Sequence, residues 1–263
     1  MADINPNKKP MHLTFLGTGT SSGVPVIGCR CCVCTSGDAR DRRLRCSALL
    51  ETERGTRVLL DCGPDFRQQV MGLPFRPFDA VLLTHEHYDH VGGLDDLRPY
   101  GTFGHTHVWT DATCKRHLEQ RMPYCFAGPQ QSSVPRIVLH EARSGEAFRV
   151  GELDVLPVEV MHGRLPILGY RIGAFAYVTD LKTIAPASVE MLRGVRTLVL
   201  NALRHKPHPT HQTIAEAVAL AAEIGAERTF LTHFNHDAPP HAESSGCLPP
   251  SVRFAYDGLR IEV

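Results

Sequence analysis

Six consecutive residues, from His85 to His90, carry three imidazole rings and two carboxylates in the order HEHYDH. Imidazole nitrogen and carboxylate oxygen together suit Zn, Mn or Fe and are poor ligands for Ca or Mg. The segment follows AVLLT at residues 80–84, a continuous apolar run of the kind that forms a buried strand. A solvated histidine-rich turn is the alternative, but the preceding strand favours an anchored metal site at its C-terminal end.

Three more candidate ligands, His162, Asp180 and His233, each follow an apolar stretch. Any one of them alone would more often be an ordinary loop or core residue. With the HEHYDH segment they complete a predicted set of seven ligands: His85, His87, Asp89, His90, His162, Asp180 and His233. Two divalent ions in such a set can share a hydroxide and bind both the attacking and the leaving oxygen of a phosphoryl displacement.

Four thiols lie within residues 29–34, in the order CRCCVC. The CxCxxC spacing of Cys29, Cys31 and Cys34 offers three soft thiolates, and a fourth donor would complete a closed tetrahedral zinc site. A redox pair or free surface thiols are the competing interpretation. We expect the scattered thiols to be small buried hydrophobic residues, namely Cys46, Cys62, Cys114, Cys125 and Cys247.

The loop at residues 201–213 combines three histidines with two cations just before an Ala-rich helix. We expect Thr210 to be the N-cap of that helix, which places His211 at the positive helix end, where anions are favoured. The loop therefore predicts a phosphate site, with substrate-binding residues Arg204, His205 and Lys206. Solvated loop histidines are the alternative for His205 and His208. The basic run RDRRLR at residues 40–45 is either a second phosphate clamp or a solvated face.

Apolar runs between turn residues predict the elements that position these side chains. The expected strands cover residues 12–16, 48–51, 57–61, 80–84, 107–110, 137–139, 147–150, 153–160, 168–172, 174–179, 195–201 and 229–232, with a closing hairpin at 254–256 and 259–263. The expected helices cover residues 64–71, 92–100, 112–122 and 213–224, and residues 124–134 form a loop. Because no linker or repeat interrupts them, we expect a polar extension at residues 1–11 and a single domain at 12–263.

The composition excludes several classes of partner. Twenty-eight Lys and Arg against 28 Asp and Glu leave no net charge with which to attract long nucleic acid or an anionic membrane. The sequence contains no apolar run of roughly 18 residues, the length that a membrane span needs, and its start has no apolar signal region. We therefore expect a cytoplasmic protein in which many of the 15 His and 9 Cys bind metal.

The order of these donors resembles that of the metallo-β-lactamase-fold hydrolases, with HxHxDH, a distant His, a bridging Asp and a last His. The match runs from residue 13 to 263 and is most similar to the PhnP-type cyclic phosphodiesterases, and more distantly to the tRNA 3′-processing endonucleases. The resemblance implies an α/β (α+β) fold, a four-layer αββα sandwich with the site at one edge. It also implies the ligand partition: His85, His87 and His162 on one metal, Asp89, His90 and His233 on the second, and Asp180 bridging.

The resemblance assigns further residues. In PhnP-type proteins an early CxCxxC joins a His three residues beyond the last catalytic His, which implies a structural zinc site of Cys29, Cys31, Cys34 and His236, with Cys32 spare. The HxT element at residues 211–213 implies that His211 lies by the scissile phosphate as proton donor or oxyanion stabiliser, with His208 the second choice. The tRNA-processing relatives have a Glu where this chain has Asn201.

A role for Asp61 follows from the residues themselves. It ends the predicted strand RVLLD, and we interpret it as a carboxylate that orients a ligand histidine. A turn residue before Gly63 is an equal alternative.

We predict a metallohydrolase with two active-site ions, Zn, Mn or Fe, and one structural Zn. A metal-bridging hydroxide attacks a small, cyclic or linear phosphodiester, with catalytic residues Asp89 and His211. An acyl hydrolase acting on a thioester or lactone is the alternative enzyme, and a non-catalytic metal-binding protein is the third hypothesis. We expect no long nucleic acid and no membrane as partner, and a homodimer stays open.

Overall fold

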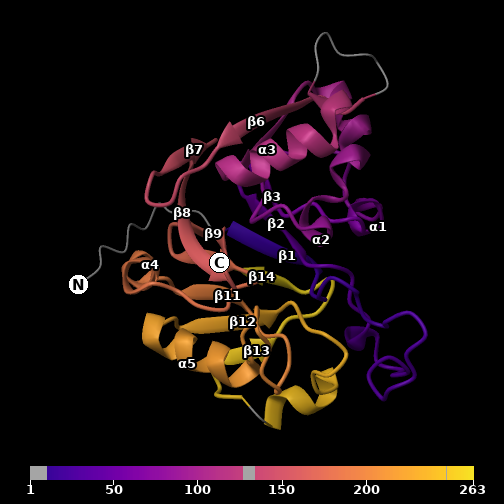
Figure 1. The fold of residues 1–263 in the computed structure, drawn as a ribbon, viewed down its shortest axis with the longest axis vertical. Coiled ribbons are helices and arrows are strands. Elements are labelled where there is room, and N and C mark those ends of the chain that lie inside the picture. Colours follow the sequence, from indigo (N-terminus) through magenta and orange to yellow (C-terminus); the bar gives the residue numbers. More distant parts are fainter. Residues whose placement is uncertain (1–10, 127–133, 247) are drawn as a thin grey trace.

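The computed structural model describes residues 11–126, 134–246 and 248–263. Within these residues two seven-stranded sheets face each other, and helices cover the outer face of each sheet (Figure 1). The four-layer αββα sandwich is thereby confirmed. Most of the expected extension at 1–11, much of the 124–134 loop, and Cys247 lie outside the described residues.

The first sheet has the strand order β14-β1-β2-β3-β4-β5-β6. Its strands are β1 (Met11–Gly17), β2 (Ser47–Thr52), β3 (Arg57–Leu60), β4 (Ala80–Leu82), β5 (Thr106–Thr110), β6 (Ile137–Glu141) and β14 (Arg260–Glu262). Strands β3 to β6 are mutually parallel, whereas β1 is antiparallel to both β2 and β14. Beyond β14, the N–H of Val263 donates to the carbonyl of Met11 at 2.8 Å.

The second sheet has the strand order β13-β12-β11-β10-β9-β8-β7. Its strands are β7 (Phe148–Val150), β8 (Leu153–His162), β9 (Leu165–Ile172), β10 (Phe175–Val178), β11 (Thr197–Asn201), β12 (Arg228–Thr232) and β13 (Val252–Phe254). The predicted closing hairpin is wrong, because β13 pairs in parallel with β12 while β14 joins the other sheet. Asp257 turns the chain between the sheets by accepting hydrogen bonds from the hydroxyl of Thr18 and the N–H of Leu44.

The helices cover the two outer faces. On the first sheet lie α1 (Phe66–Val70), α2 (Tyr88–Val91), α3 (Ala112–Arg121) and the 3₁₀ segments η2 (Leu94–Phe103) and η3 (Pro123–Cys125). On the second lie α4 (Pro186–Leu192) and α5 (Ile214–Ile224), while η1 (Ala39–Asp41) and η4 (His241–Gly246) belong to loops. In place of the α-helix expected at 92–100, the chain forms the 3₁₀ segment η2, which contains Pro99, a residue that the interior of an α-helix tolerates poorly. The sequence reasoning missed α4.

Thr210 is not the N-cap of α5, so that prediction is wrong. Thr213 is the N-cap, and its hydroxyl and the carboxylate of Glu216 exchange hydrogen bonds with each other's backbone N–H in a capping box. His211 and Gln212 therefore precede the helix and are free to turn towards the sheet edge.

Three apolar clusters hold the layers together. One fills the space between the sheets, one lies between the second sheet and α4 and α5, and one lies between the first sheet and α1, η2 and α3. The parallel strands within each sheet end at one common edge, as in other α/β proteins, and the loops leaving that edge carry the predicted ligands. Within the described residues no helix is both long and apolar enough to cross a membrane.

Candidate metal centre

The ends of four strands deliver the predicted ligands to one place. The HEHYDH segment follows β4, His162 is the last residue of β8, Asp180 follows β10, and His233 follows β12. Potential ligand atoms lie within 4.8 Å of one another in the groups His85, His87, His162 and Asp89, His90, His233. The structure thus brings together the residues of the two triads that the family resemblance implied.

Asp180 lies between the triads. Its Oδ2 is 3.2 Å from Nε2 of His90, and its Oδ1 is 3.1 Å from Nε2 of His233. Asp180 also groups with His85 and His90 as a possible metal-binding set. One carboxylate therefore reaches both halves of the cluster, as a bridging ligand must.

An unusual backbone conformation directs three of the side chains at this site toward the cluster. Asp61, Asp180 and His233 are the non-glycine residues with positive φ in the described chain, at 59°, 58° and 62°. Each follows a strand, β3, β10 or β12, at the site edge. The left-handed conformation costs a non-glycine residue on the order of 1–3 kcal/mol and persists where the surrounding structure enforces it. It turns the chain so that each side chain faces the cluster.

The donor set fits divalent metal ions. Nε2 of His90 and both ring nitrogens of His233 are buried and lack a partner with hydrogen-bond geometry, although carboxylates lie close by. Burial holds the pKa of His85 well below its ordinary value, which keeps that imidazole neutral as a ligand must be. Burial opposes charge on His90 as well, but Asp180, Asp89 and Asp61 together hold its pKa well above the ordinary value. The carboxylates thus favour positive charge at the centre of the cluster.

A further layer of contacts orients the ligand rings. Oδ2 of Asp61 is 2.8 Å from Nδ1 of His90, and Oδ1 of Asp61 accepts the N–H of Thr84 at 2.8 Å. The hydroxyl of Thr84 in turn contacts Nδ1 of His85 at 2.9 Å. Nδ1 of His162 contacts the carbonyl of Asp180 at 2.8 Å. These contacts occupy Nδ1 and leave Nε2 directed at the cluster, the arrangement usual for metal-binding histidines.

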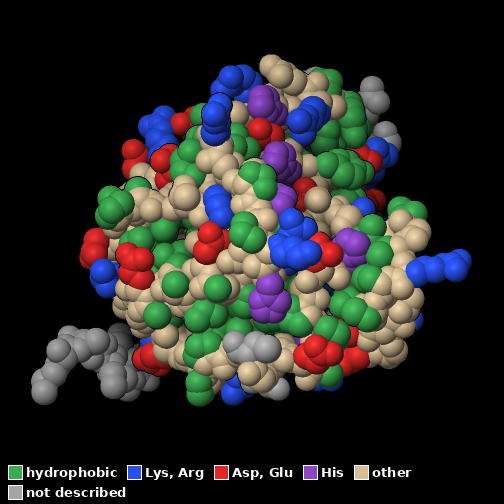
Figure 2. Space-filling model, turned by 60° about the horizontal axis from the view of Figure 1, so that its bottom comes forward, with side chains coloured by type: hydrophobic (Ala, Val, Ile, Leu, Met, Phe, Trp, Pro, Cys, Tyr) green, Lys and Arg blue, Asp and Glu red, His purple; other side chains and the backbone are tan. Residues whose placement is uncertain are grey.

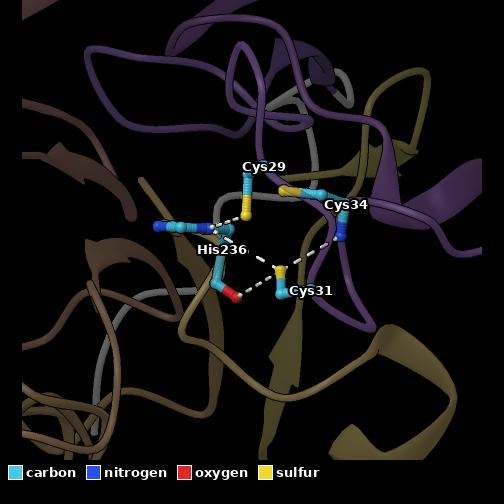
Figure 3. Close-up of side chains that lie close together, drawn as sticks. All are labelled: Cys29, Cys31, Cys34 and His236. Carbon is cyan, nitrogen blue, oxygen red and sulfur yellow. Dashed lines mark hydrogen bonds between the residues drawn. The ribbon is translucent and has the colours of Figure 1, made fainter.

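The cysteine loop forms a separate cluster beside the last ligand segment. Sγ of Cys29 and of Cys31 lie 3.1 and 3.7 Å from Nδ1 of His236, and Cys34 completes a group within 4.8 Å (Figure 3). Such spacings suit a tetrahedral ion with Zn–S bonds of about 2.3 Å. A hydrogen bond from the N–H of Cys34 lowers the pKa of the Cys31 thiol to about 6, which favours the thiolate that binds metal. Cys32 is exposed.

Four of the five scattered thiols lie in the described chain, where the prediction of buried residues is confirmed for them. Cys46, Cys62, Cys114 and Cys125 are all buried in the described chain.

The 201–213 loop brings His211 to the metal-binding cluster. Nε2 of His211 is 3.0 Å from Oδ1 of Asp180, and its Nδ1 is 3.0 Å from the hydroxyl of Thr210 and 3.1 Å from Nδ1 of His208. Burial lowers the pKa of His211 to about 4. Figure 2 shows histidine side chains gathered across one face of the molecule, with Lys and Arg side chains beside several of them.

The predicted substrate cations lie farther out. His205 and Lys206 are exposed, whereas Arg204 forms an ion pair with Asp237 at 2.7 Å. Three of the four arginines in the run at 40–45 are engaged by other groups of the protein. Arg40 pairs with Asp38, Arg43 is buried over the ring of Phe234, and Arg45 pairs with Asp65. The contacts of Thr84 with His85 and of Thr210 with His211 were not predicted, since a Thr beside a His carries no distinctive signal for such a contact.

Comparisons with known proteins agree with this architecture. The family model described as "Beta-lactamase superfamily domain" matches residues 56–234. A solved diphosphatase from the PhnP family is 41% identical, with 97% of each chain covered and a TM-score of 0.89. A ribonuclease Z of Methanopyrus kandleri is 29% identical over 82% of this chain and 90% of its own.

An octanoyltransferase of Porphyromonas gingivalis is 45% identical over 250 residues, which make up 95% of this chain. This chain spans about half of that protein, 51% of its length.

Proposed function

The chain belongs to the beta-lactamase superfamily and, within it, to the PhnP family, and from its metal centre we propose that it hydrolyses a small phosphodiester. The superfamily comprises metal-dependent hydrolases, and the PhnP-family diphosphatase supports a phosphoric ester as the substrate. The observation that carries the proposal is His211. Its Nε2 lies 3.0 Å from the carboxylate that reaches both ligand triads, so an acid or hydrogen-bond donor faces the reaction centre without being needed as a ligand.

We propose the following ligand assignment. His85, His87 and His162 would hold one divalent ion, and Asp89, His90 and His233 the second, with Asp180 shared. When bound, such a pair of ions lowers the pKa of water between them and neutralises charge on the phosphoryl oxygens. Cys29, Cys31, Cys34 and His236 would hold a structural zinc ion. Zn, Mn and Fe all suit the active-site donors.

The chain's own groups complete the chemistry. The hydroxyl of Thr210 can donate to Nδ1 of His211, which leaves the ring hydrogen on Nε2, directed at the centre. The neutral ring of His211 can then donate a hydrogen bond from Nε2 to the oxygen of the leaving group, and His208 lies against Nδ1 of the same ring. Asp61 and Thr84 hold the rings of His90 and His85 in place. His205 and Lys206 would attract the anionic substrate from solution.

A small substrate fits better than long RNA. The chain has no net charge, and within the 40–45 run Arg40, Arg43 and Arg45 are engaged by groups of the protein itself. Phosphate-backbone binding depends on many free cations. We also propose a single domain over residues 12–263 and a reducing, cytoplasmic location, because a zinc site of thiolates requires reduced cysteines.

Hydrolysis of bis-p-nitrophenyl phosphate tests the proposal. We expect the wild type loaded with two ions to release p-nitrophenol and Asp89→Ala to lose a metal ion and activity. His211→Ala should keep both ions and lose activity about 100- to 1,000-fold, the usual contribution of one hydrogen-bond donor to the charge that develops in the transition state. Full activity in His211→Ala would refute its role. An inert wild type with both ions bound would refute the phosphodiesterase.

The similarity to the octanoyltransferase favours a second candidate, an acyl thioester hydrolase. A dinuclear centre serves acyl transfer as well as phosphoryl transfer, so the fold does not decide between them. Octanoyl-coenzyme A and the phosphodiester should be assayed side by side with one metal-loaded preparation. A higher kcat/KM for the thioester would replace the first proposal with the second.

A further inference from the structure

Asn201, the last residue of β11, is fully buried and bonds to a segment twenty residues away in sequence. Its Oδ1 accepts the N–H of Leu181 at 2.8 Å, and its Nδ2 donates to the carbonyl of the same residue at 3.0 Å. The side-chain amide therefore pairs with Leu181 as a neighbouring strand would. The asparagine amide carries its donor and its acceptor on two separate atoms, as this pairing with both backbone groups of one residue needs.

The pairing occurs where β10 leaves the sheet. Strand pairing between β10 and β11 ends at Val178 and Leu200, and Asp180 then adopts its left-handed φ of 58°. Beyond that turn the backbone groups of Leu181 face the interior, where an unpaired N–H or carbonyl would be costly. Asn201 satisfies both groups and so fixes the turn from the far side of Asp180.

The same carbonyl links the turn to the loop of His211. The N–H of Gln212 donates to the carbonyl of Leu181 at 3.1 Å, and the carbonyl of Gln212 accepts the N–H of Leu203 at 2.9 Å. Leu181 thus joins the segment bearing the bridging carboxylate to the segment bearing the candidate acid.

We propose that Asn201 is a positioning residue that sets the orientation of the Asp180 carboxylate and its separation from His211. The inference rests on the metal centre of the proposed function. It also accounts for the residue type at this position. Among the described contacts, Nδ1 of His211 is already in contact with Thr210 and His208. A carboxylate at position 201, such as the Glu of the tRNA-processing relatives, is therefore not required to orient that ring, and the amide of Asn201 can bond to the backbone of Leu181 instead.

Two substitutions separate the amide's functions. Asn201→Asp keeps the size and the acceptor but sets a carboxylate oxygen against the carbonyl of Leu181, whereas Asn201→Ser removes the reach of the side chain. Thr197→Val is the matched control, because Thr197 is a buried polar residue at the other end of β11 whose hydroxyl accepts from Arg228 at 2.9 Å. All three variants remove a hydrogen bond made by a buried side chain of the same strand, but only two of them lie beside Asp180.

The readout is the electron paramagnetic resonance spectrum of the protein loaded with two Mn²⁺ ions, since a carboxylate shared by both ions affects their exchange coupling. We expect both Asn201 variants to change the coupled signal and to lower kcat about 10- to 100-fold, the range for groups that orient metal ligands, with KM little changed. Thr197→Val should show a lower Tm with the native signal and kcat.

A native signal and native kcat in both Asn201 variants would overturn the proposal, as would the same changes in Thr197→Val. The spectrum needs no substrate, so it decides the role of Asn201 separately from the reaction. A wild type that binds two ions but hydrolyses no phosphodiester would remove the proposed function and leave the spectral test standing.

Discussion

Asp61 offers the sharpest test of how the metal centre is held. Its carboxylate is fully buried, contacts Nδ1 of His90 at 2.8 Å, and accepts the N–H of Thr84 at 2.8 Å. In Asp61→Asn the N–H of Thr84 still requires the carbonyl oxygen of the new amide, so the amide nitrogen must face His90. Two N–H donors then oppose each other, and His90 must move its hydrogen to Nε2, the atom that would bind metal.

The expected loss of metal affinity follows from the conflict between the two N–H donors. Loss of a partner that orients a ligand histidine weakens metal binding about 10- to 100-fold, or about 1.4–2.8 kcal/mol. The loss should fall on the ion that Asp89, His90 and His233 would hold, while the ion that His85, His87 and His162 would hold stays closer to native affinity. Asp61 also fixes Thr84, which contacts His85, so a smaller effect on the first ion is expected.

Titration of metal-free protein with Zn²⁺ against a competing chelator measures the two affinities separately. Asp65→Asn is a suitable control, because Asp65 accepts the backbone N–H and the guanidinium of Arg45 and does not contact a predicted ligand in the described structure. Equal affinity for both ions in Asp61→Asn and wild type, with the variant folded by circular dichroism, would refute the reasoning.

Three further changes test other parts of the structure. Cys29→Ser should remove about one Zn per chain by elemental analysis and leave the active-site pair; unchanged Zn would exclude the cysteine site. Gly63→Ala should weaken metal binding and lower Tm, since a Cβ there lies 2.0 Å from the carbonyl oxygen of Asp89, whereas Gly72→Ala meets nothing within 4 Å and should resemble wild type in both measurements. Burial raises the pKa of Asp257 from 3.8 to about 6, so the folded state binds more protons than the unfolded state between these values and loses stability as pH rises through them. Relative to Asp257→Asn, urea unfolding of the wild type should show a loss of about 2 kcal/mol between pH 4.5 and 7; a difference that does not vary with pH would contradict that pKa.

The clustering of the candidate ligands could be predicted because its signals are local. HEHYDH directly follows an apolar strand, and CRCCVC has metal-binding spacing, so residue type and position suffice. Resemblance to a family supplied the partition between two ions and the partner His236. Asp61 was predicted as one of two alternatives, and the structure places it against His90.

The remaining features depend on distant contacts. Thr210 and Thr213 are both reasonable N-caps in sequence, and only the reciprocal bonds with Glu216 select Thr213. Strands β13 and β14 resemble a hairpin because the Asp257-Gly258 turn joins them, yet Asp257 bonds to Thr18 and Leu44 and sends them to different sheets. The role of Asn201 requires the left-handed turn at Asp180, which no local pattern marks.

The pairing of β1 with β14 places both ends of the described fold together. His12 lies opposite Glu262, and the N–H of Val263 donates to the carbonyl of Met11. At the opposite end of β1, the carbonyl of Thr18 accepts the N–H of Phe234, which directly follows the candidate ligand His233. A short linker could therefore join residue 263 to residue 11, and new termini could open in a surface loop, without moving a ligand. By the same geometry, a second domain attached at either end would begin at the end of the sandwich opposite the candidate metal centre.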